Sequence, residues 1–397
     1  MFRFCTIALI SALSISLSTG FVSAQEIADA KAGKPLSHVQ DAANAPENSA
    51  LQMVAEIAGA MPTGITVSHD GRLFLSFPRW GEPVDSTVVE LKDSKIVPYP
   101  DAEINKLNET DPANCFVSVQ SVVADSANHL WVLDSGNLKM GKNFPKGPKL
   151  VEIDLASNKI IKKIVFPADV ALPTTYLNDI RIDPNRGDGM AYITDSASEG
   201  EAGIIVVDLG TQESWRRLSG EPSVMADTKF VPTVEGQSLM QREEGKEPKP
   251  LAVGADSIAL SPDGQTLYWR PLASHHLYSI STSLLVDRTA EVEQVSDGAK
   301  DLGDLGFASD GMCFDKDGTL YLTNYEQHAI MRGDPTQSPV KFDKFVDDPR
   351  LIWPDTLSFS EAGELYMTVN QIDRQPPFHE GKDLRQPPYA VLKIATK

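Results

Sequence analysis

Oxygen-bearing side chains recur at one position of a pattern that this chain repeats six times. The position lies at the start of the first strand of each copy. It is occupied by Thr63, Gln120, Asn178 with Asp179, Asp256, Asp310 and Asp355. If the copies surround one axis, these oxygens converge, and they suit Ca²⁺ or a similar hard cation. Carboxylates gathered without a cation would repel one another and raise their pKa values.

A second interpretation of these aspartates is local. An aspartate beside a strand or turn often accepts hydrogen bonds from nearby backbone amides. On this interpretation each carboxylate caps its own turn and no shared site exists. The residues alone leave both interpretations open.

The repeated pattern itself predicts the elements that position these residues. Each copy has an apolar strand, a polar turn, and a second strand rich in Leu, Tyr and Trp. The turn contains Asp-Gly in four copies, which supplies the positive φ of a tight hairpin. A third strand follows most copies, and a fourth can follow it, as in residues 159–167. The copies cover residues 65–77, 117–134, 178–195, 256–271, 310–324 and 355–369.

The spacing of the copies predicts an all-β fold, a six-bladed β-propeller. The copies follow one another at intervals of roughly 45 to 77 residues, with about four strands each, as in propeller blades. No segment of useful length shows apolar residues at helical spacing. Residues 51–57 precede the first copy, and we expect them to add a strand to the last blade and close the ring. The longest interval contains residues 235–250, a polar stretch that predicts an exposed loop.

Charge and motifs exclude several functions. Lys and Arg number 36 against 55 Asp and Glu, for a net charge of −19, which disfavours nucleic acid and anionic membranes as partners. The chain contains no P-loop, dinucleotide fingerprint or Gly-x-Ser-x-Gly elbow, so no nucleotide cofactor is expected. The histidines form no H-x-x-x-H pair and the cysteines no C-x-x-C pair, so a zinc site is not predicted.

The first residues predict export of the protein. A positive start, an apolar run from Phe4 to Leu17 and small residues before Gln25 are typical of a signal peptide over residues 1–24, cleaved after Ala24. A membrane anchor is the alternative. Residues 25–50 then form a flexible leader, and residues 51–397 a single propeller domain. No later run reaches the ~20 apolar residues of a membrane span, so we expect a secreted or periplasmic protein without stable membrane insertion.

Two cysteines and two loops complete the candidates. After cleavage Cys115 and Cys313 remain; they could pair in an oxidising compartment, although the apolar surroundings of Cys313 favour a buried thiol. Trp80 follows the first copy and either rims the site or packs on a neighbouring blade. Asn324 and Tyr325 follow the fifth copy and either reach a ligand or belong to a solvated loop.

Several segments resemble the yellow/major royal jelly protein family. The segments are LFLSFPRWG (73–81), LWVLDSG (130–136), YLNDIRID (176–183), IALSPDGQTLYWRPLASHHLYSI (258–280) and WPDTLSF (353–359). The resemblance runs from about Met61 to Ile394. It implies secretion and a six-bladed propeller. Roles differ among members: some insect members convert dopachrome, salivary members bind biogenic amines, and royal jelly members are storage or signalling proteins.

A fainter resemblance concerns the regucalcin/gluconolactonase family. Asp310 begins the segment DGMCFD, which resembles that family's motif with a metal-binding Asp. Asn178-Asp179 is similar to its Asn-Asp, and Asp256 falls where it has an Asn ligand. The resemblance thus implies a divalent cation, Ca²⁺ first, held by Asn178, Asp256 and Asp310. The chain departs from the family in its first blade, where Thr63 replaces a Glu, and this weakens the cation site.

Three hypotheses for the function follow. In the first, the protein binds a small organic molecule in its channel and, if it is an enzyme, isomerises it by proton transfer at carboxylates. In the second, it is a metal-dependent lactone or ester hydrolase with Asp179 as the catalytic base. In both, Thr63, Gln120, Asp355, Asn324 and Tyr325 are candidate ligand contacts. In the third, it is a non-catalytic interaction protein. Fold alone does not choose among them, and the oligomeric state is left open.

Overall fold

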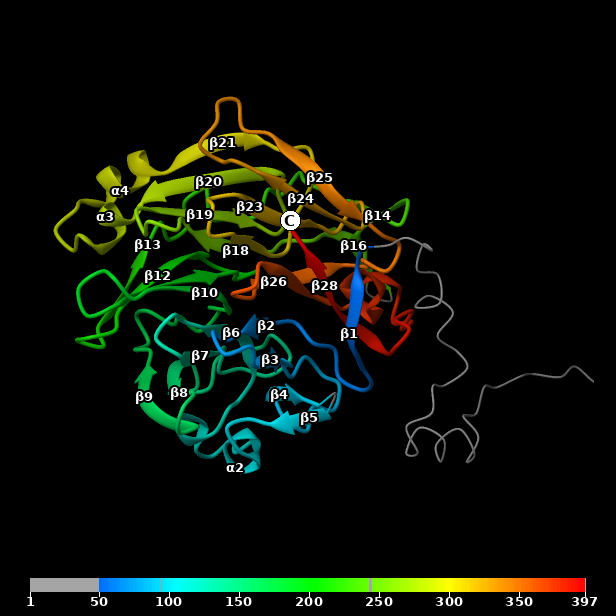
Figure 1. Ribbon diagram of the computed structural model, residues 1–397. Coiled ribbons are helices and arrows are strands. Elements are labelled where there is room, and N and C mark those ends of the chain that lie inside the picture. The colour runs from blue at the N-terminus through cyan, green and yellow to red at the C-terminus, as the bar shows by residue number, and fades with distance from the viewer. Residues whose placement is uncertain (1–49, 94, 243–244, 397) are drawn as a thin grey trace, which may run out of the picture. The chain divides into compact units, whose positions relative to one another are not determined.

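Six four-stranded antiparallel sheets are arranged as blades around a common centre (Figure 1), which confirms the predicted six-bladed β-propeller. The computed structural model describes residues 50–93, 95–242 and 245–396. The predicted signal peptide and all but the last residue of the predicted leader lie outside these residues.

The first three blades follow the chain in order, each running from its innermost to its outermost strand. Blade 1 contains β2 (Ile65–Val67), β3 (Leu73–Ser76), β4 (Val88–Lys92) and β5 (Lys95–Pro98). Blade 2 contains β6 (Val119–Ala124), β7 (His129–Asp134), β8 (Lys149–Asp154) and β9 (Lys159–Val165). Blade 3 contains β10 (Leu177–Asp183), β11 (Met190–Asp195), β12 (Gly203–Asp208) and β13 (Ser214–Arg217).

The other three blades follow in chain order, and the last of them joins the two ends of the described chain. Blade 4 contains β18 (Ala255–Leu260), β19 (Thr266–Pro271), β20 (His276–Ser281) and β21 (Lys300–Asp304). Blade 5 contains β22 (Met312–Phe314), β23 (Leu320–Asn324), β24 (Ala329–Gly333) and β25 (Phe342–Asp347). Blade 6 contains β26 (Pro354–Phe359), β27 (Glu364–Val369), β28 (Tyr389–Ala395) and β1 (Gln52–Ile57). The blue β1 pairs with the red β28 (Figure 1), so the predicted closing strand is confirmed.

The turns between the first and second strands have the predicted backbone. The glycine of each Asp-Gly turn has a positive φ: 81° at Gly71, 101° at Gly189, 70° at Gly264 and 88° at Gly318. In blade 2 the equivalent residue is Asn128 with φ 65°. Asparagine tolerates this left-handed conformation better than most residues, which explains why that copy lacks a glycine.

The core lies between the blades. Six apolar clusters of the described residues each join two neighbouring blades. Leu133 of blade 2 and Ile193 of blade 3, for example, are fully buried in one of them. A seventh cluster lies under the loops at one end of the ring and includes Tyr325, Trp353 and Phe378. Each inner strand is therefore fixed by packing on both of its faces.

Short elements and loops outside the blades complete the fold. The helical segments are α2 (Ala102–Asn105), α3 (Thr282–Val286), α4 (Val292–Gly298), η2 (Pro112–Asn114), η3 (Ile372–Arg374) and η4 (Pro376–Phe378). Between blades 3 and 4, two short hairpins are formed by β14 (Thr233–Val234) with β15 (Gln237–Ser238) and β16 (Met240–Gln241) with β17 (Lys249–Pro250). The described helices include none long and apolar enough to cross a bilayer. Cys115 and Cys313 are free thiols and do not pair.

Candidate functional site

A cavity of about 190 Å³ opens where the inner strands begin, and we call it the acidic cavity. Five of the predicted site residues line it: Gln120, Asn178, Asp256, Asp310 and Asp355. Its walls are largely apolar and aromatic, formed by Trp80, Met140, Tyr176, Leu251, Val253, Leu272, Ile372, Pro377 and Phe378. Among the described residues, no lysine, arginine or histidine lines it. The cavity therefore offers oxygen atoms at its floor and nonpolar surface above.

Breaks in strand register position most of these side chains. The pairing of the first two strands shifts between Val119 and Ser121 in blade 2, and between Ala255 and Ser257 in blade 4. Similar shifts flank Asn178-Asp179 in blade 3 and Asp355 in blade 6. An unpaired residue at a bulge can direct its side chain away from the regular alternation. In these four blades the bulge thus turns a residue at the start of the inner strand toward the channel.

Hydroxyl groups of the preceding blade fix the same residues from behind. Ser76 Oγ donates to the Gln120 carbonyl oxygen at 2.8 Å, and Thr194 Oγ1 donates to the Asp256 carbonyl oxygen at 2.7 Å. Thr368 Oγ1 donates in the same way to the Thr63 carbonyl oxygen at 2.6 Å. A buried hydroxyl needs such a partner, so each bond ties the backbone of one blade to the next.

The three aspartates of the cavity disfavour full ionisation. Burial raises the pKa of Asp256 well above its usual range, and the charges of Asp310 and Asp355 raise it further. Burial likewise raises the pKa of Asp355 well above its usual range, with Asp310 adding to the effect. Burial raises the pKa of Asp310 to about 7, although a hydrogen bond from Trp353 opposes the rise. The carboxyl groups of Asp256 and Asp310 are in hydrogen-bond contact, so near neutral pH this pair shares protons.

An aromatic pair supports Asp310. Trp353 Nε1 donates to Asp310 Oδ2 at 2.5 Å, and the indole stacks on the Tyr325 ring with centroids 4.1 Å apart. Tyr325 in turn donates its hydroxyl to the Leu272 carbonyl oxygen at 2.9 Å. Trp353 has a φ of 53°, which is unusual for a bulky residue and costs of order 1–3 kcal/mol. The packing around it therefore holds the indole N–H in place against that strain.

A second chain of hydrogen bonds orients Gln120. Trp80 Nε1 donates to the Tyr176 hydroxyl oxygen at 2.7 Å, and that hydroxyl donates to Gln120 Oε1 at 2.8 Å. The amide oxygen of Gln120 is thereby engaged, which leaves its NH₂ group for a ligand. Asn178 is oriented the other way, because its Nδ2 donates to Ser196 Oγ at 3.2 Å and leaves the amide oxygen available. Trp80 lines the cavity and also packs against the apolar cluster between blades 6 and 1, so both interpretations of this residue describe its position.

The remaining predicted residues lie near the cavity without lining it. Thr63 is buried and donates its hydroxyl to the Gln120 carbonyl oxygen at 3.2 Å. Asn324 and Tyr325 are fully buried. Asp179 lines a neighbouring cavity of about 150 Å³ and accepts a hydrogen bond from Ser121 Oγ at 2.8 Å. Of the nine predicted site residues, five thus line the acidic cavity, and Thr63, Asp179, Asn324 and Tyr325 lie around it.

The donor set meets only part of the requirement for a calcium ion. Asn178, Asp256 and Asp310 offer oxygen atoms, but Ca²⁺ takes six to eight of them. Asp310 Oδ2 already accepts from Trp353, and Asp355 Oδ2 accepts from Asn370 Nδ2 at 2.5 Å. In the described part of the chain, no group of three or more His, Cys, Asp or Glu side chains is arranged to hold a metal ion. As arranged, these residues do not form a closed metal site.

Sequence reasoning missed the residues that support the floor. Tyr176 and Trp353 each stand two positions before a cavity residue, at the end of the segment that leads into the inner strand. An aromatic residue at that offset in two copies is the signal that would have found them. The hydroxyl residues Ser76, Thr194 and Thr368 share one position near the end of the second strand, which is a second such signal.

Comparison with known families and proteins gives a consistent result. Residues 117–382 match the family described as major royal jelly protein. Protein yellow of Drosophila madeirensis is 31% identical over 258 residues, which cover 60% of this chain and 42% of that protein. Protein yellow of Drosophila melanogaster is 28% identical over 345 residues, 80% of this chain and 59% of that protein. This chain therefore spans less than two thirds of the length of these curated relatives.

Solved structures show the same architecture at low identity. A luciferin-regenerating enzyme is 12% identical with a TM-score of 0.52, covering 87% of this chain and 94% of its own. A gluconolactonase from Xanthomonas campestris is 13% identical with a TM-score of 0.51, covering 87% of this chain and 88% of its own. At such identities the similarity establishes the fold alone.

Proposed function

From the fact that this chain belongs to the major royal jelly protein family, we propose that it binds a small organic molecule carrying a positive charge in the acidic cavity. The observation that carries the proposal is the lining of one cavity by three carboxyl groups and an apolar, aromatic wall, without a basic side chain among the described residues. A cation at the floor would replace the protons that the carboxyl groups share. An apolar body attached to it would contact the wall.

The walls favour a compact ligand with a flat apolar part. A cavity of about 190 Å³ is smaller than the ~300–1,000 Å³ of typical ligand pockets, so only a compact ligand fits it. Trp80 and Phe378 supply aromatic surface, which attracts cations through the ring face as well as apolar groups by contact. The NH₂ group of Gln120 and the amide oxygen of Asn178 would add direction to the binding.

The same arrangement supports proton transfer within a bound ligand. Asp310, with a pKa of about 7, and the adjoining Asp256 form a pair that holds a proton near neutral pH. A carboxyl group of this kind can donate a proton to one ligand atom while a neighbouring carboxylate accepts one from another. We therefore assign any isomerisation to Asp256 and Asp310, which line the cavity, whereas Asp179 lies behind it.

Three ligands of matched shape test the binding proposal. Benzylammonium, benzoate and benzyl alcohol differ in charge and share the ring, and each is titrated in a thermal-shift assay. We expect benzylammonium alone to raise Tm, since a ligand at a hundredfold excess over Kd stabilises by about 2.7 kcal/mol. Asp355→Asn should weaken its binding about tenfold, while Asp343→Asn on an exposed strand should not. Equal responses to benzoate and benzylammonium would contradict the proposal.

A metal-dependent lactone or ester hydrolase is the second candidate. It is favoured by the shared lining of Asn178, Asp256 and Asp310, three oxygen donors on one cavity. Because the donor set is incomplete, we derive no hydrolytic step from it. Metal analysis of the purified protein, with lactone hydrolysis measured in added Ca²⁺, tests this candidate. If neither the ammonium probe nor Ca²⁺ has an effect, the third hypothesis, a non-catalytic interaction protein, gains support.

Secretion is a further part of the proposal. It rests on the apolar run of residues 4–17 and the small residues that precede Gln25. Expression with the full N-terminus, followed by N-terminal sequencing of the exported protein, tests it. We expect the mature chain to begin at Gln25.

A further inference from the structure

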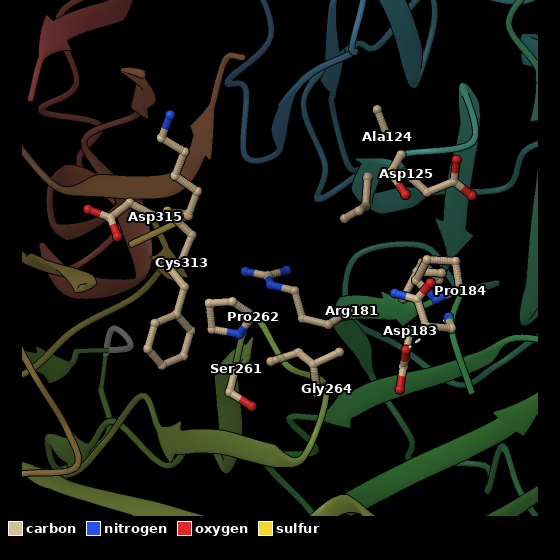
Figure 2. Close-up of a pocket in the computed structure, with 17 residues that line it drawn as sticks. Ala124, Asp125, Arg181, Asp183, Pro184, Ser261, Pro262, Gly264, Cys313 and Asp315 are labelled. Atoms are coloured by element: carbon tan, nitrogen blue, oxygen red, sulfur yellow. Dashed lines mark hydrogen bonds between the residues drawn. The ribbon is translucent and has the colours of Figure 1, made fainter. Parts of the chain in front are cut away.

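A second cavity opens at the other end of the ring, where the inner strands end. It has a volume of about 390 Å³ and is surrounded by the turns of blades 2 to 5. Figure 2 shows Arg181 pointing into the middle of this cavity from β10, with Cys313 in the wall. Arg181 and Cys313 also line the smaller cavity that contains Asp179.

The contacts of Arg181 cross the channel. Its Nη1 donates to the Ile180 carbonyl oxygen at 2.6 Å in blade 3. Its Nη2 donates to the Met312 carbonyl oxygen at 2.7 Å in blade 5 and lies 3.4 Å from Asp179 Oδ2. Blade 4 lies between these blades in the ring, so the side chain spans from one inner strand to another that is not its neighbour. The guanidinium thus has acceptors on both sides of the channel.

The two ends of the channel are separate. The acidic cavity shares no lining residue with either of the cavities that Arg181 lines, within the described residues. Asp179 and Arg181, whose side chains are only 11% and 15% exposed, line the smaller cavity and not the acidic one. The charge of Asp179 raises the pKa of both Asp256 and Asp310, so this ion pair lies close to the acidic floor.

We propose that the Arg181 side chain closes the channel beneath the acidic cavity, so that a ligand enters and leaves only at the loop side. The inference rests on the proposed binding function only for its ligand readout. A side chain of this length is needed to reach from β10 to the Met312 carbonyl oxygen. Its charge satisfies Asp179, which would otherwise be a buried carboxylate with one hydroxyl donor.

The charges around the second cavity, on the side of the turns, argue against a separate ligand site there. Asp125, Asp183 and Asp315 line it together with Lys316, and each aspartate accepts a hydrogen bond from a backbone amide of its own turn. Their negative charges would repel an anion that approached Arg181, while Arg181 would repel a cation. Closure of the channel accounts for an arginine at this position without requiring a ligand.

Thiol labelling tests the closure without any ligand. Cys313 lines the second cavity beside Arg181, so its labelling reports how far the arginine side chain fills the channel at this wall. Its reaction with methyl methanethiosulfonate is followed by peptide mass spectrometry. The buried Cys115 serves as an internal control. Arg181→Ala should label Cys313 at least tenfold faster than wild type, whereas Arg181→Met, which fills similar space without charge, should stay within about threefold. Equal rates in wild type and Arg181→Ala, or equal acceleration in both variants, would overturn the closure.

Dissociation of benzylammonium tests the consequence for a ligand. In stopped-flow displacement, Arg181→Ala should release the probe at least threefold faster than wild type, and Arg181→Met should not. Arg186→Met is the matched control, because Arg186 also belongs to blade 3 but lines none of the three cavities, although its partner Asp183 lines the second one. An unchanged dissociation rate in Arg181→Ala would show that no second exit opens in this variant and would contradict the closure. If wild type does not bind the probe, the proposed function fails while thiol labelling still decides the closure.

Discussion

Replacing Asp310 by asparagine should make the protein more stable above neutral pH. The asparagine side chain would keep an oxygen that accepts from Trp353 Nε1, and its NH₂ group could donate to Asp256. The variant therefore removes the charge and preserves the two contacts. Burial raises the pKa of Asp310 from its ordinary 3.8 to about 7, so the folded protein binds a proton that the unfolded chain has lost.

The sign and size of the effect follow from this difference. A raised pKa contributes stability that is fully present below about pH 4 and is lost as the pH rises to about 7. Each pH unit in that window removes about 1.4 kcal/mol, so the total is about 4 kcal/mol. Wild type should lose this stability between pH 4 and 7, and Asp310→Asn should not. At pH 8 the variant should therefore be the more stable protein by up to about 4 kcal/mol.

Urea unfolding at pH 5, 6, 7 and 8 measures the effect. The difference in the free energy of unfolding between variant and wild type reports Asp310 together with its effect on Asp256, because the titrating groups away from this pair are common to both proteins. Asp343→Asn, at an exposed position, is the control and should follow wild type at every pH. Parallel pH dependence in Asp310→Asn and wild type would refute the reasoning that Asp310 carries a proton in the folded state.

Three further predictions concern the loops, the backbone and the wall of the cavity. Glu235 and Arg374 form an ion pair that joins the loop hairpins to η3. Glu235→Arg and Arg374→Glu should each speed benzylammonium dissociation about threefold in stopped flow, and the double variant should restore the wild-type rate. Gly311→Ala would place a Cβ 2.0 Å from the Asp355 carbonyl oxygen and should destabilise by about 2–4 kcal/mol in urea unfolding; a loss below about 0.5 kcal/mol would contradict this contact. Tyr176→Phe removes the hydroxyl that joins Trp80 to Gln120 and should weaken benzylammonium binding about tenfold, measured by calorimetry. An unchanged affinity would show that this hydroxyl does not orient Gln120 for the ligand.

The sequence predicted the blades because their signals are local. The alternation of the strands and the positive-φ turn at Gly71 or Gly264 each occupy fewer than twenty consecutive residues. The period then follows from repetition. Closure by residues 51–57 was predictable for a different reason: an open ring would leave an unpaired edge, and only one segment of suitable pattern was left to cover it.

The detail of the site was not predictable from one chain, because it depends on contacts between blades. Nothing local relates Trp353 to Asp310, which lies in the preceding blade. Asn178 and Asp179 are adjacent in the sequence and were assigned to one position of the ring. Successive side chains of a strand point in different directions, so Asn178 lines the acidic cavity and Asp179 the next one.

The construction of blade 6 from both ends of the described chain has a consequence for biosynthesis. Until β28 leaves the ribosome, β1 has no partner, and the edge of β27 is unpaired as well. Asp355, the last carboxyl group of the cavity, also arrives with this late segment. A prematurely terminated product should therefore be both an open sheet prone to association and a protein without the complete acidic floor. Quality control would need to recognise only the exposed edge in order to remove chains that lack the complete acidic cavity.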